Sequence, residues 1–177
     1  FAMSDVHGCY DELMALYKQL PITPETDKLI ILGDHIDRGP KSKQVVEQLM
    51  MWKKQYPHWE FLYGNHEDLM LDALVYGGKI YNYFDLWYQQ GGKETFMSYV
   101  DPALTRYEKA LVQIKDAISK EHLEFLAGLP VFVETEDYYF AHAGFKPGIK
   151  TEDQQRQDMI WIRDEFIDST YDFGKKV

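Results

Sequence analysis

Hydrophobic and polar positions follow two different periods in the N-terminal third of the chain. Short apolar runs at residues 29–32 and 61–63 are typical of strands buried on both faces. Residues 10–20 and 45–53 instead place apolar side chains three and four positions apart, which is the spacing of amphipathic helices. Residues 1–4 read as the end of another buried strand. Strands and helices that alternate in this way predict parallel pairing and an α/β layered architecture.

A mostly helical segment covers residues 67–127 and is interrupted by two glycine pairs. Two strand-like runs follow at 131–133 and 138–141, joined by a short acidic turn, which predicts a β-hairpin. The helical segment is therefore predicted to be an insertion between sheet segments of one domain, 1–177. The chain begins inside a predicted strand, and Val177 could open another, so we expect this domain to be truncated at both ends.

The charge balance excludes several classes of partner. The 177 residues carry 29 acidic and 19 basic side chains, which gives a formal charge of -10. Binding to nucleic acid or to an anionic membrane surface needs a basic face, so neither partner is expected. The single cysteine, Cys9, cannot close an intrachain disulfide, and no apolar run is long enough to span a bilayer. We therefore expect a cytoplasmic protein.

Polar side chains gather where four predicted strands end. In an open α/β sheet the carboxyl ends of parallel strands face one crevice, so residues far apart in the sequence converge there. The four segments are Asp5-Val6-His7-Gly8, Gly33-Asp34-His35-Ile36-Asp37-Arg38-Gly39, Gly64-Asn65-His66-Glu67 and Ala141-His142-Ala143-Gly144. Their convergence predicts a single site.

Several of these side chains offer ligand atoms for a metal ion. Carboxylate oxygen, imidazole nitrogen and amide oxygen together suit manganese, iron or zinc better than calcium. Asp34 is central in the order of the motifs and is predicted to bridge two ions. Two ions about 3.5–4 Å apart can clamp a phosphate and hold a shared hydroxide for in-line attack, so the motifs predict a hydrolase. The predicted ligands are Asp5, His7, Asp34, Asn65 and His142.

The remaining charged residues of the motifs predict acid catalysis. Asp37 is three residues past Asp34 and is better placed to hold His66 than to bind a metal. A carboxylate partner fixes the tautomer of an imidazole and keeps the ring protonated. His66 is therefore the predicted general acid for the departing alkoxide, a role that contributes about 10²–10⁴-fold. The planar guanidinium of Arg38 matches phosphate oxygens bidentately.

Each motif taken alone also has a purely structural interpretation. Asp5 and His7 could form a strand-end turn, and residues 33–39 could be a tight loop with a solvated ion pair. Asn65 could cap a helix, and His142 could be a satisfied core histidine. Their joint occurrence at four strand ends favours a site.

Other residues with chemical potential are assigned no role. His35, His58 and His122 lack a comparable setting. Small-residue packing explains Cys9 better than nucleophilic catalysis does, because no base is evident nearby. An aromatic stretch in the helical segment is predicted to pack in the core, with a substrate groove as the less favoured alternative. It contains Tyr81, Tyr83, Phe84, Trp87 and Tyr88.

The motifs D-x-H-G, G-D-x-x-D-R-G, G-N-H-E and H-A-G, in this order, resemble those of the calcineurin-like metallophosphoesterases. The pattern is most similar to the phosphoprotein phosphatase branch, especially the small bacterial and phage serine/threonine phosphatases, and it extends as far as Arg163. The resemblance implies a β-sandwich of two mixed sheets flanked by helices. It also implies two divalent metal ions at the strand ends, often manganese.

The resemblance implies how the ligands divide between the two ions. Asp5, His7 and Asp34 would hold the first ion. Asp34, Asn65 and His142 would hold the second ion. In the family, this second ion also receives a histidine from a G-H-T segment, and the present sequence has no such segment. Because the last four residues resemble the lead-in to that strand, we expect the histidine to follow the sequence given; without it, the second site is damaged.

The remaining roles concern the acid and the substrate. The resemblance implies that Asp37 and His66 form the acid couple. It also implies that the substrate phosphate contacts Arg38, Asn65 and Arg163. The last assignment rests on the resemblance alone, because residues before Arg163 are similar to a family segment that supplies a second phosphate-binding arginine.

Three functions are compatible with this pattern. A metal-dependent phosphatase that acts on phosphoserine or phosphothreonine in proteins, or on a small phosphate ester, is favoured. One alternative is hydrolysis of a dinucleoside polyphosphate such as diadenosine tetraphosphate. Relatives with that activity tend to lack a counterpart of Asp37 and to carry aspartate in place of Glu67, so the sequence favours the phosphatase. The other alternative is a non-catalytic phosphate-sensing module, which has no physical need for a general acid such as His66.

Overall fold

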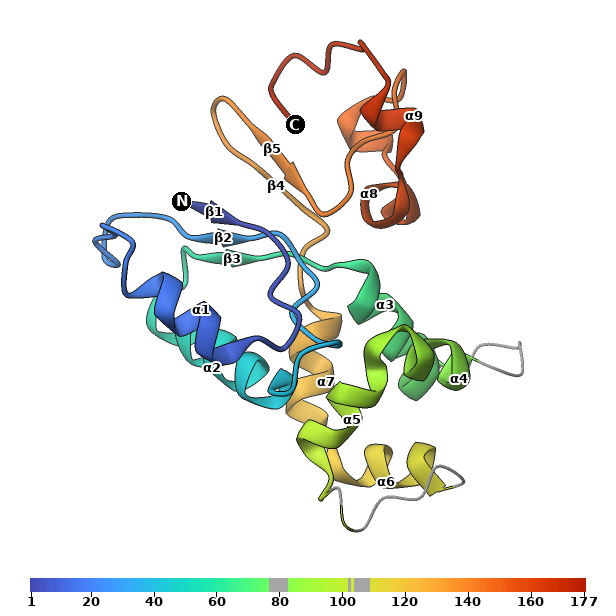
Figure 1. Cartoon of the computed structure of the whole chain (residues 1–177). Coiled ribbons are helices and arrows are strands. Elements are labelled where there is room, and N and C mark those ends of the chain that lie inside the picture. Colours follow the sequence, from blue (N-terminus) through green and yellow to red (C-terminus); the bar gives the residue numbers. More distant parts are fainter. Residues whose placement is uncertain (77–82, 102, 104–108) are drawn as a thin grey trace.

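Three short parallel strands organise the N-terminal half of the computed structural model, which describes residues 1–76, 83–101, 103 and 109–177. The strands are β1 (Ala2–Met3), β2 (Ile30–Ile31) and β3 (Glu60–Phe61), in the spatial order β1-β2-β3 (Figure 1). In the register of this sheet, Ile30 pairs with Ala2 on one side and with Glu60 on the other. The central strand is buried on both faces, as its apolar run predicted.

Two amphipathic helices cover one face of this sheet. They are α1 (Tyr10–Tyr17) and α2 (Ser42–Gln55), which follow β1 and β2 and lie together below the strands in Figure 1. Leu13 from α1 and Leu49 from α2 belong to the same buried cluster as Ile31 of the sheet. Burial of such side chains stabilises the layer by roughly 1.5–3 kcal/mol each. The predicted alternation of strand and helix is confirmed.

The predicted helical insertion is also present. It comprises α3 (Asn65–Leu71), a π-helical turn (Asp72–Tyr76), α4 (Tyr83–Trp87), a turn kinked at Gly91 (Tyr88–Gly92), α5 (Lys93–Tyr99), α6 (Ala110–Ala117) and α7 (Lys120–Ala127). These helices enclose a second core that includes Met70, Trp87 and Phe96. The first predicted glycine pair and Tyr81 lie outside the described residues.

A second, smaller sheet follows the insertion. Strands β4 (Phe132–Glu134) and β5 (Tyr139–Ala141) form the predicted antiparallel hairpin. Lys176 makes a parallel bridge with Tyr138, so this sheet combines both pairings, whereas the sheet of β1, β2 and β3 is wholly parallel. The 3-10 turn Thr151–Asp153 and helices α8 (Arg156–Trp161) and α9 (Asp164–Ile167) come after the hairpin (Figure 1).

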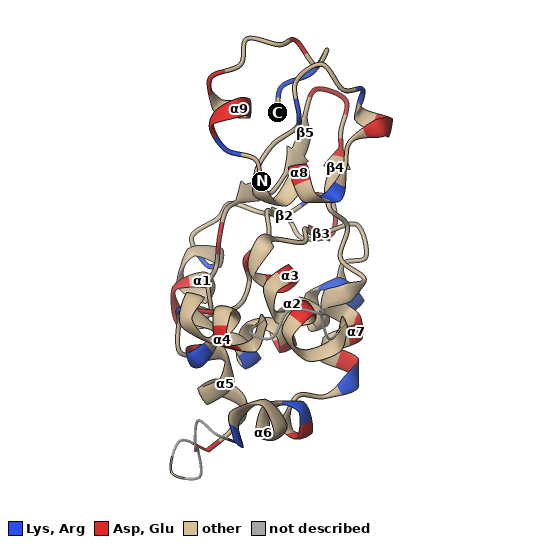
Figure 2. Ribbon diagram, turned by 90° about the vertical axis from the view of Figure 1, so that its right-hand side faces the viewer, with Lys and Arg blue, Asp and Glu red and all other residues tan. Residues whose placement is uncertain are grey.

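The surface charges do not form a basic stripe in the view of Figure 2. Lys and Arg positions alternate there with Asp and Glu positions along the ribbon of the described residues. Among the helices of the described residues, none combines the length and the apolarity that a bilayer crossing requires.

Candidate active site

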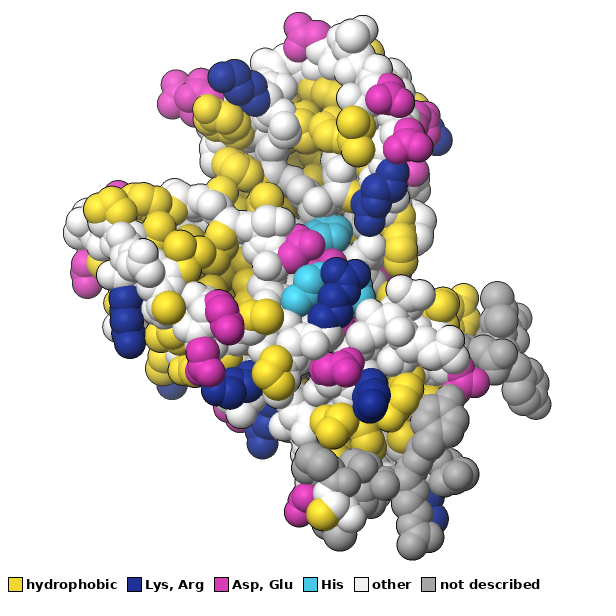
Figure 3. All heavy atoms as spheres, in the orientation of Figure 1, with side chains coloured by type: hydrophobic (Ala, Val, Ile, Leu, Met, Phe, Trp, Pro, Cys, Tyr) yellow, Lys and Arg dark blue, Asp and Glu magenta, His cyan; other side chains and the backbone are white. Residues whose placement is uncertain are grey.

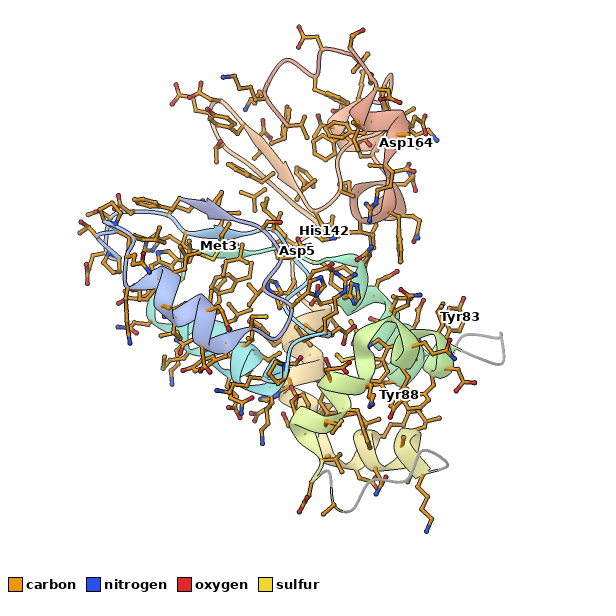
Figure 4. All side chains as sticks on the ribbon, viewed as in Figure 1. Met3, Asp5, Tyr83, Tyr88, His142 and Asp164 are labelled. Carbon is orange, nitrogen blue, oxygen red and sulfur yellow. The ribbon has the colours of Figure 1, made fainter. Side chains whose placement is uncertain are left out.

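Loops and helix starts at the carboxyl ends of the strands bring the predicted site residues together. Figure 4 shows Asp5 and His142 side by side, although they follow strands of two different sheets. In the space-filling view of Figure 3, histidines gather with acidic and basic side chains where the upper and lower parts of the molecule meet. The contributing segments are the loop after β1, the loop after β2, the first turn of α3 and the residue that follows β5.

The backbone of this site is strained. Four non-glycine residues in the described part of the chain have a positive φ: His7 (46°), Asp34 (51°), Asp37 (72°) and Arg38 (65°). This left-handed region costs an ordinary side chain about 1 kcal/mol or more and persists only where the surroundings enforce it. All four are residues that the sequence assigns to the site. The strained backbone positions therefore coincide with residues of the predicted site.

The carboxylate of Asp34 is the centre of the cluster. Its Oδ2 lies 3.6 Å from Nε2 of His7, and its Oδ1 lies 3.5 Å from Nε2 of His142. Oδ2 of Asp5 is 3.8 Å from the same nitrogen of His7. Two groups have ligand atoms close enough to share an ion, and Asp34 belongs to both: one adds His7 and His66, the other adds Asp5 and His142. This central position agrees with the predicted bridging role.

The donor atoms are oriented as metal ligands would be. Nδ1 of His7 donates to the carbonyl of Ile36 (2.9 Å), and Nδ1 of His142 donates to the carbonyl of Leu32 (2.8 Å). With Nδ1 protonated in this way, Nε2 of each ring carries a lone pair, and it lies within 3.6 Å of an Asp34 oxygen in His7 and within 3.5 Å in His142. Among the described residues, the buried Oδ1 of Asn65 has no hydrogen-bond partner. A buried amide oxygen without a partner is costly, and a divalent cation would satisfy it. The residues present therefore fit a metal centre.

The side chain of Glu67 accepts hydrogen bonds from the backbone around Asp34, a role that the sequence analysis did not assign. Its side chain is fully buried, and Oε2 accepts hydrogen bonds from the backbone N–H groups of Asp34 (3.0 Å) and Gly64 (2.9 Å). Oε1 accepts a third hydrogen bond from the N–H of His35 (2.8 Å). Burial raises the pKa of Glu67, and the neighbouring charge of Asp34 raises it further. The carboxylate thereby joins the loop after β2 to the end of β3.

The predicted contact between Asp37 and His66 is present. Nδ1 of His66 lies 2.7 Å from Oδ2 of Asp37, whose side chain is fully buried. Burial raises the pKa of Asp37, and hydrogen bonds from His66, Thr95 and Trp87 act in the opposite direction. The last two come from the helical insertion. Sequence analysis placed Trp87 in the core, with a substrate groove as the less favoured alternative, and did not consider Thr95, because nothing local to either residue indicates a carboxylate partner.

The two predicted arginines differ in their placement. The guanidinium of Arg38 lies over the site, where it donates to Nε2 of His7 (2.8 Å) and to Nε2 of His66 (3.1 Å). Arg163 caps the start of α9, is exposed, and donates to the carbonyl of its neighbour Ile162 (3.0 Å). Arg38 thus contacts two histidines of the cluster, whereas the hydrogen bond of Arg163 goes to the carbonyl of its own neighbour.

The other histidines have structural partners. The fully buried ring of His35 makes a 2.8 Å hydrogen bond to the carbonyl of Leu62, and burial lowers the pKa of His35 to about 4. His58 bonds to the carbonyl of Asp27, and His122 bonds to the hydroxyl of Tyr99. None of these contacts requires a catalytic role, in agreement with the sequence analysis.

The known proteins to which the chain is similar include enzymes of two kinds. The chain is 44% identical over 77 residues to a symmetrical bis(5'-nucleosyl)-tetraphosphatase of Salmonella arizonae, a match that covers 44% of the chain and 26% of that enzyme. It is 27% identical over 177 residues to serine/threonine-protein phosphatase 2 of Salmonella typhimurium, which covers all of the chain and 63% of the phosphatase. The chain thus spans less than two thirds of either relative.

A solved structure and a family model agree with this result. A protein identified provisionally as a diadenosine tetraphosphatase superposes with a TM-score of 0.60 at 19% identity, over 89% of this chain and 55% of that one. This likeness confirms the α/β fold class. The model of the calcineurin-like phosphoesterases matches residues 1–171. Because this match takes in all four strand-end motifs and almost the whole chain, the chain belongs to the calcineurin-like phosphoesterase family.

Proposed function

We propose that the full-length protein is a metal-dependent phosphatase that removes phosphate from phosphoserine or phosphothreonine in proteins. The observation that carries this proposal is the 2.7 Å contact between His66 and Asp37, placed beside the Asp34 cluster. An alkoxide leaving group, as in phosphoserine, needs a proton when it departs, and this couple is built to deliver one. Similarity along the whole chain to a serine/threonine phosphatase supports the same substrate class.

The five clustered ligands would hold two divalent ions, for which we propose manganese. Asp5, His7 and Asp34 would hold one ion, and Asp34, Asn65 and His142 would hold the other. When bound, the ions supply positive charge to the phosphate and lower the pKa of a water molecule. The shared position of Asp34 supports its bridging role, and Oδ1 of Asn65, which lacks a partner among the described residues, supports Asn65 as a ligand. The division of the other ligands between the two ions rests on the resemblance of the motifs.

The chain's own residues perform the remaining steps. Arg38 would donate hydrogen bonds from both of its terminal nitrogens to phosphate oxygens, in place of the two imidazoles to which it donates in the structure. That exchange would free Nε2 of His66 to carry the proton for the leaving oxygen, while its Nδ1 stays on Asp37. For Arg163 we propose a second phosphate contact, for which its exposed side chain would have to leave the carbonyl of Ile162.

A second candidate substrate is diadenosine tetraphosphate. The 44% identity to a symmetrical tetraphosphatase over 77 residues favours it, because this is the higher local identity of the two relatives. The experiment that separates the two substrates is a comparison of kcat/KM for a phosphoserine peptide and for diadenosine tetraphosphate, measured on the full-length protein with manganese. A preference for the phosphopeptide would support our proposal. A large preference for the dinucleotide would replace it, and no turnover by protein shown to hold metal would favour a phosphate-sensing module.

A further inference from the structure

Three side chains donate hydrogen bonds to the carboxylate of Asp37. Nδ1 of His66 donates to Oδ2, and the hydroxyl of Thr95 donates to Oδ1 at 2.6 Å. The indole N–H of Trp87 lies 3.1 Å from both oxygens. A carboxylate has about four acceptor positions, so these three donors occupy most of what Asp37 offers. With Oδ1 taken by Thr95, Oδ2 is the oxygen that remains for the imidazole.

Two of the three donors come from a distant part of the sequence. Trp87 ends α4 and Thr95 lies in α5, 50 and 58 residues beyond Asp37, and both side chains are fully buried. The hydroxyl of Thr95 also accepts a hydrogen bond from the backbone N–H of Asp37 (2.8 Å) and lies 2.9 Å from the hydroxyl of Ser42. Since a threonine has one hydroxyl proton, Ser42 must donate to Thr95 while Thr95 donates to Asp37.

The turn Tyr88–Gly92, which lies between α4 and α5, also contacts the backbone next to Asp37. The carbonyl of Gly91 accepts a hydrogen bond from the N–H of Arg38 at 3.0 Å. A Cβ on Gly92 would collide with the indole of Trp87, so glycine is needed there for close packing. The insertion therefore contacts both the side chain and the neighbouring backbone of a segment whose φ values are positive at Asp37 and Arg38.

From this geometry we infer that Trp87 and Thr95 are positioning residues for the general acid: they hold the Asp37 carboxylate in the rotation that keeps Oδ2 on Nδ1 of His66. Without them the carboxylate could turn about χ2, and a buried oxygen would lose its donor. The ring of His66 would then lose its fixed tautomer and direction. This inference deepens the proposed function and rests on it for its effect on turnover.

The test compares two esters in the full-length protein with manganese. Thr95→Val removes the hydroxyl at nearly constant volume, and Trp87→Phe removes the indole N–H. We expect each change to lower kcat about 10-fold on an alkyl phosphate and less than about 2-fold on 2,4-dinitrophenyl phosphate, whose leaving group departs without a proton. KM and metal content should stay as in the wild type, and Thr95→Ser should restore the alkyl rate. The control Phe96→Leu changes an adjacent buried side chain and should affect both esters equally.

A second measurement does not depend on turnover. The proton on Nδ1 of His66, buried against Asp37, should give a low-field resonance in protein labelled with 15N-histidine. Thr95→Val should shift or abolish this resonance, and Phe96→Leu should preserve it. If the wild type hydrolysed neither ester, the proposed function would fail, yet loss of the resonance in Thr95→Val would still support positioning. An unchanged resonance in Thr95→Val, or equal kcat losses on both esters, would overturn the inference.

Discussion

The buried carboxylate of Glu67 accepts a hydrogen bond from the backbone N–H of Asp34 at 3.0 Å. This contact places the carboxylate of Glu67 against the backbone of Asp34, whose own carboxylate is the centre of the cluster. Because Glu67 also accepts from Gly64 and His35, it holds two strand ends in a fixed relation. The position of Asp34 thus depends on a residue that is fully buried.

Glu67→Gln should destabilise the protein. One oxygen becomes an amide nitrogen, so a donor would face a buried backbone N–H and leave it without an acceptor. The expected loss of unfolding free energy is about 1–3 kcal/mol, measured by urea denaturation. An unfolding free energy equal to that of the wild type would show that the three hydrogen bonds do not support the site.

Gly64→Ala should displace Asp34. A Cβ at this position would overlap both Oδ1 and the backbone nitrogen of Asp34, in a region with no free volume. We expect a loss of about 1–3 kcal/mol in stability together with weaker metal binding. Gly128→Ala is the matched control, because its nearest atoms would be carbonyl oxygens at 3.2 and 3.6 Å. Similar losses for both alanine variants would contradict the special role of Gly64.

His66→Asn should remove acid catalysis and preserve metal binding. Turnover of alkyl phosphates should fall by about 10²–10⁴-fold, with a much smaller loss for aryl phosphates, because a phenolate departs without a proton. The measurement is kcat on a matched pair of esters with manganese present. Equal losses on the two esters would assign His66 a role other than proton donation.

His122 should make stability depend on pH. Burial lowers the pKa of His122 below its usual 6.5; Lys43 acts in the same direction, and Glu47 and Glu121 oppose it. The unfolded chain therefore binds the proton first as the pH falls, so the stabilising contribution is present above pH 6.5 and is lost below it. The difference in unfolding free energy between the wild type and His122→Gln should shrink from pH 7.5 to pH 5. A difference in unfolding free energy that stays constant with pH would contradict the predicted direction of the pH dependence.

Much of the site could be predicted from the sequence because its signals are local. Asp34, Asn65 and His142 directly follow apolar strand-like runs, and the topology of parallel strands makes such residues converge. The contact between His66 and Asp37 was predicted for a similar reason, since each lies within a few residues of a strand end.

The supporting residues could not be found in the same way. Trp87 and Thr95 contact Asp37 from helices whose direction depends on tertiary packing, and an indole or a hydroxyl has many structural uses. From the sequence alone, Glu67 looks like an ordinary acidic residue in the first turn of a helix. Only the structure shows that it accepts a hydrogen bond from the backbone N–H of Asp34. For Arg163, no physical signal in the sequence indicated a placement, and in the structure its guanidinium donates to the carbonyl of Ile162.

The most direct test of the metal-dependent hydrolase is to measure metal content and hydrolysis of p-nitrophenyl phosphate together, on the full-length protein and on Asp34→Asn. We expect the wild type to bind a divalent ion and to lose turnover on chelation, with recovery when manganese is returned. Asp34→Asn should lose both properties, because an amide cannot bridge two cations as a carboxylate does. Turnover that survives chelation, or full metal content in Asp34→Asn, would contradict a catalytic metal centre built around Asp34.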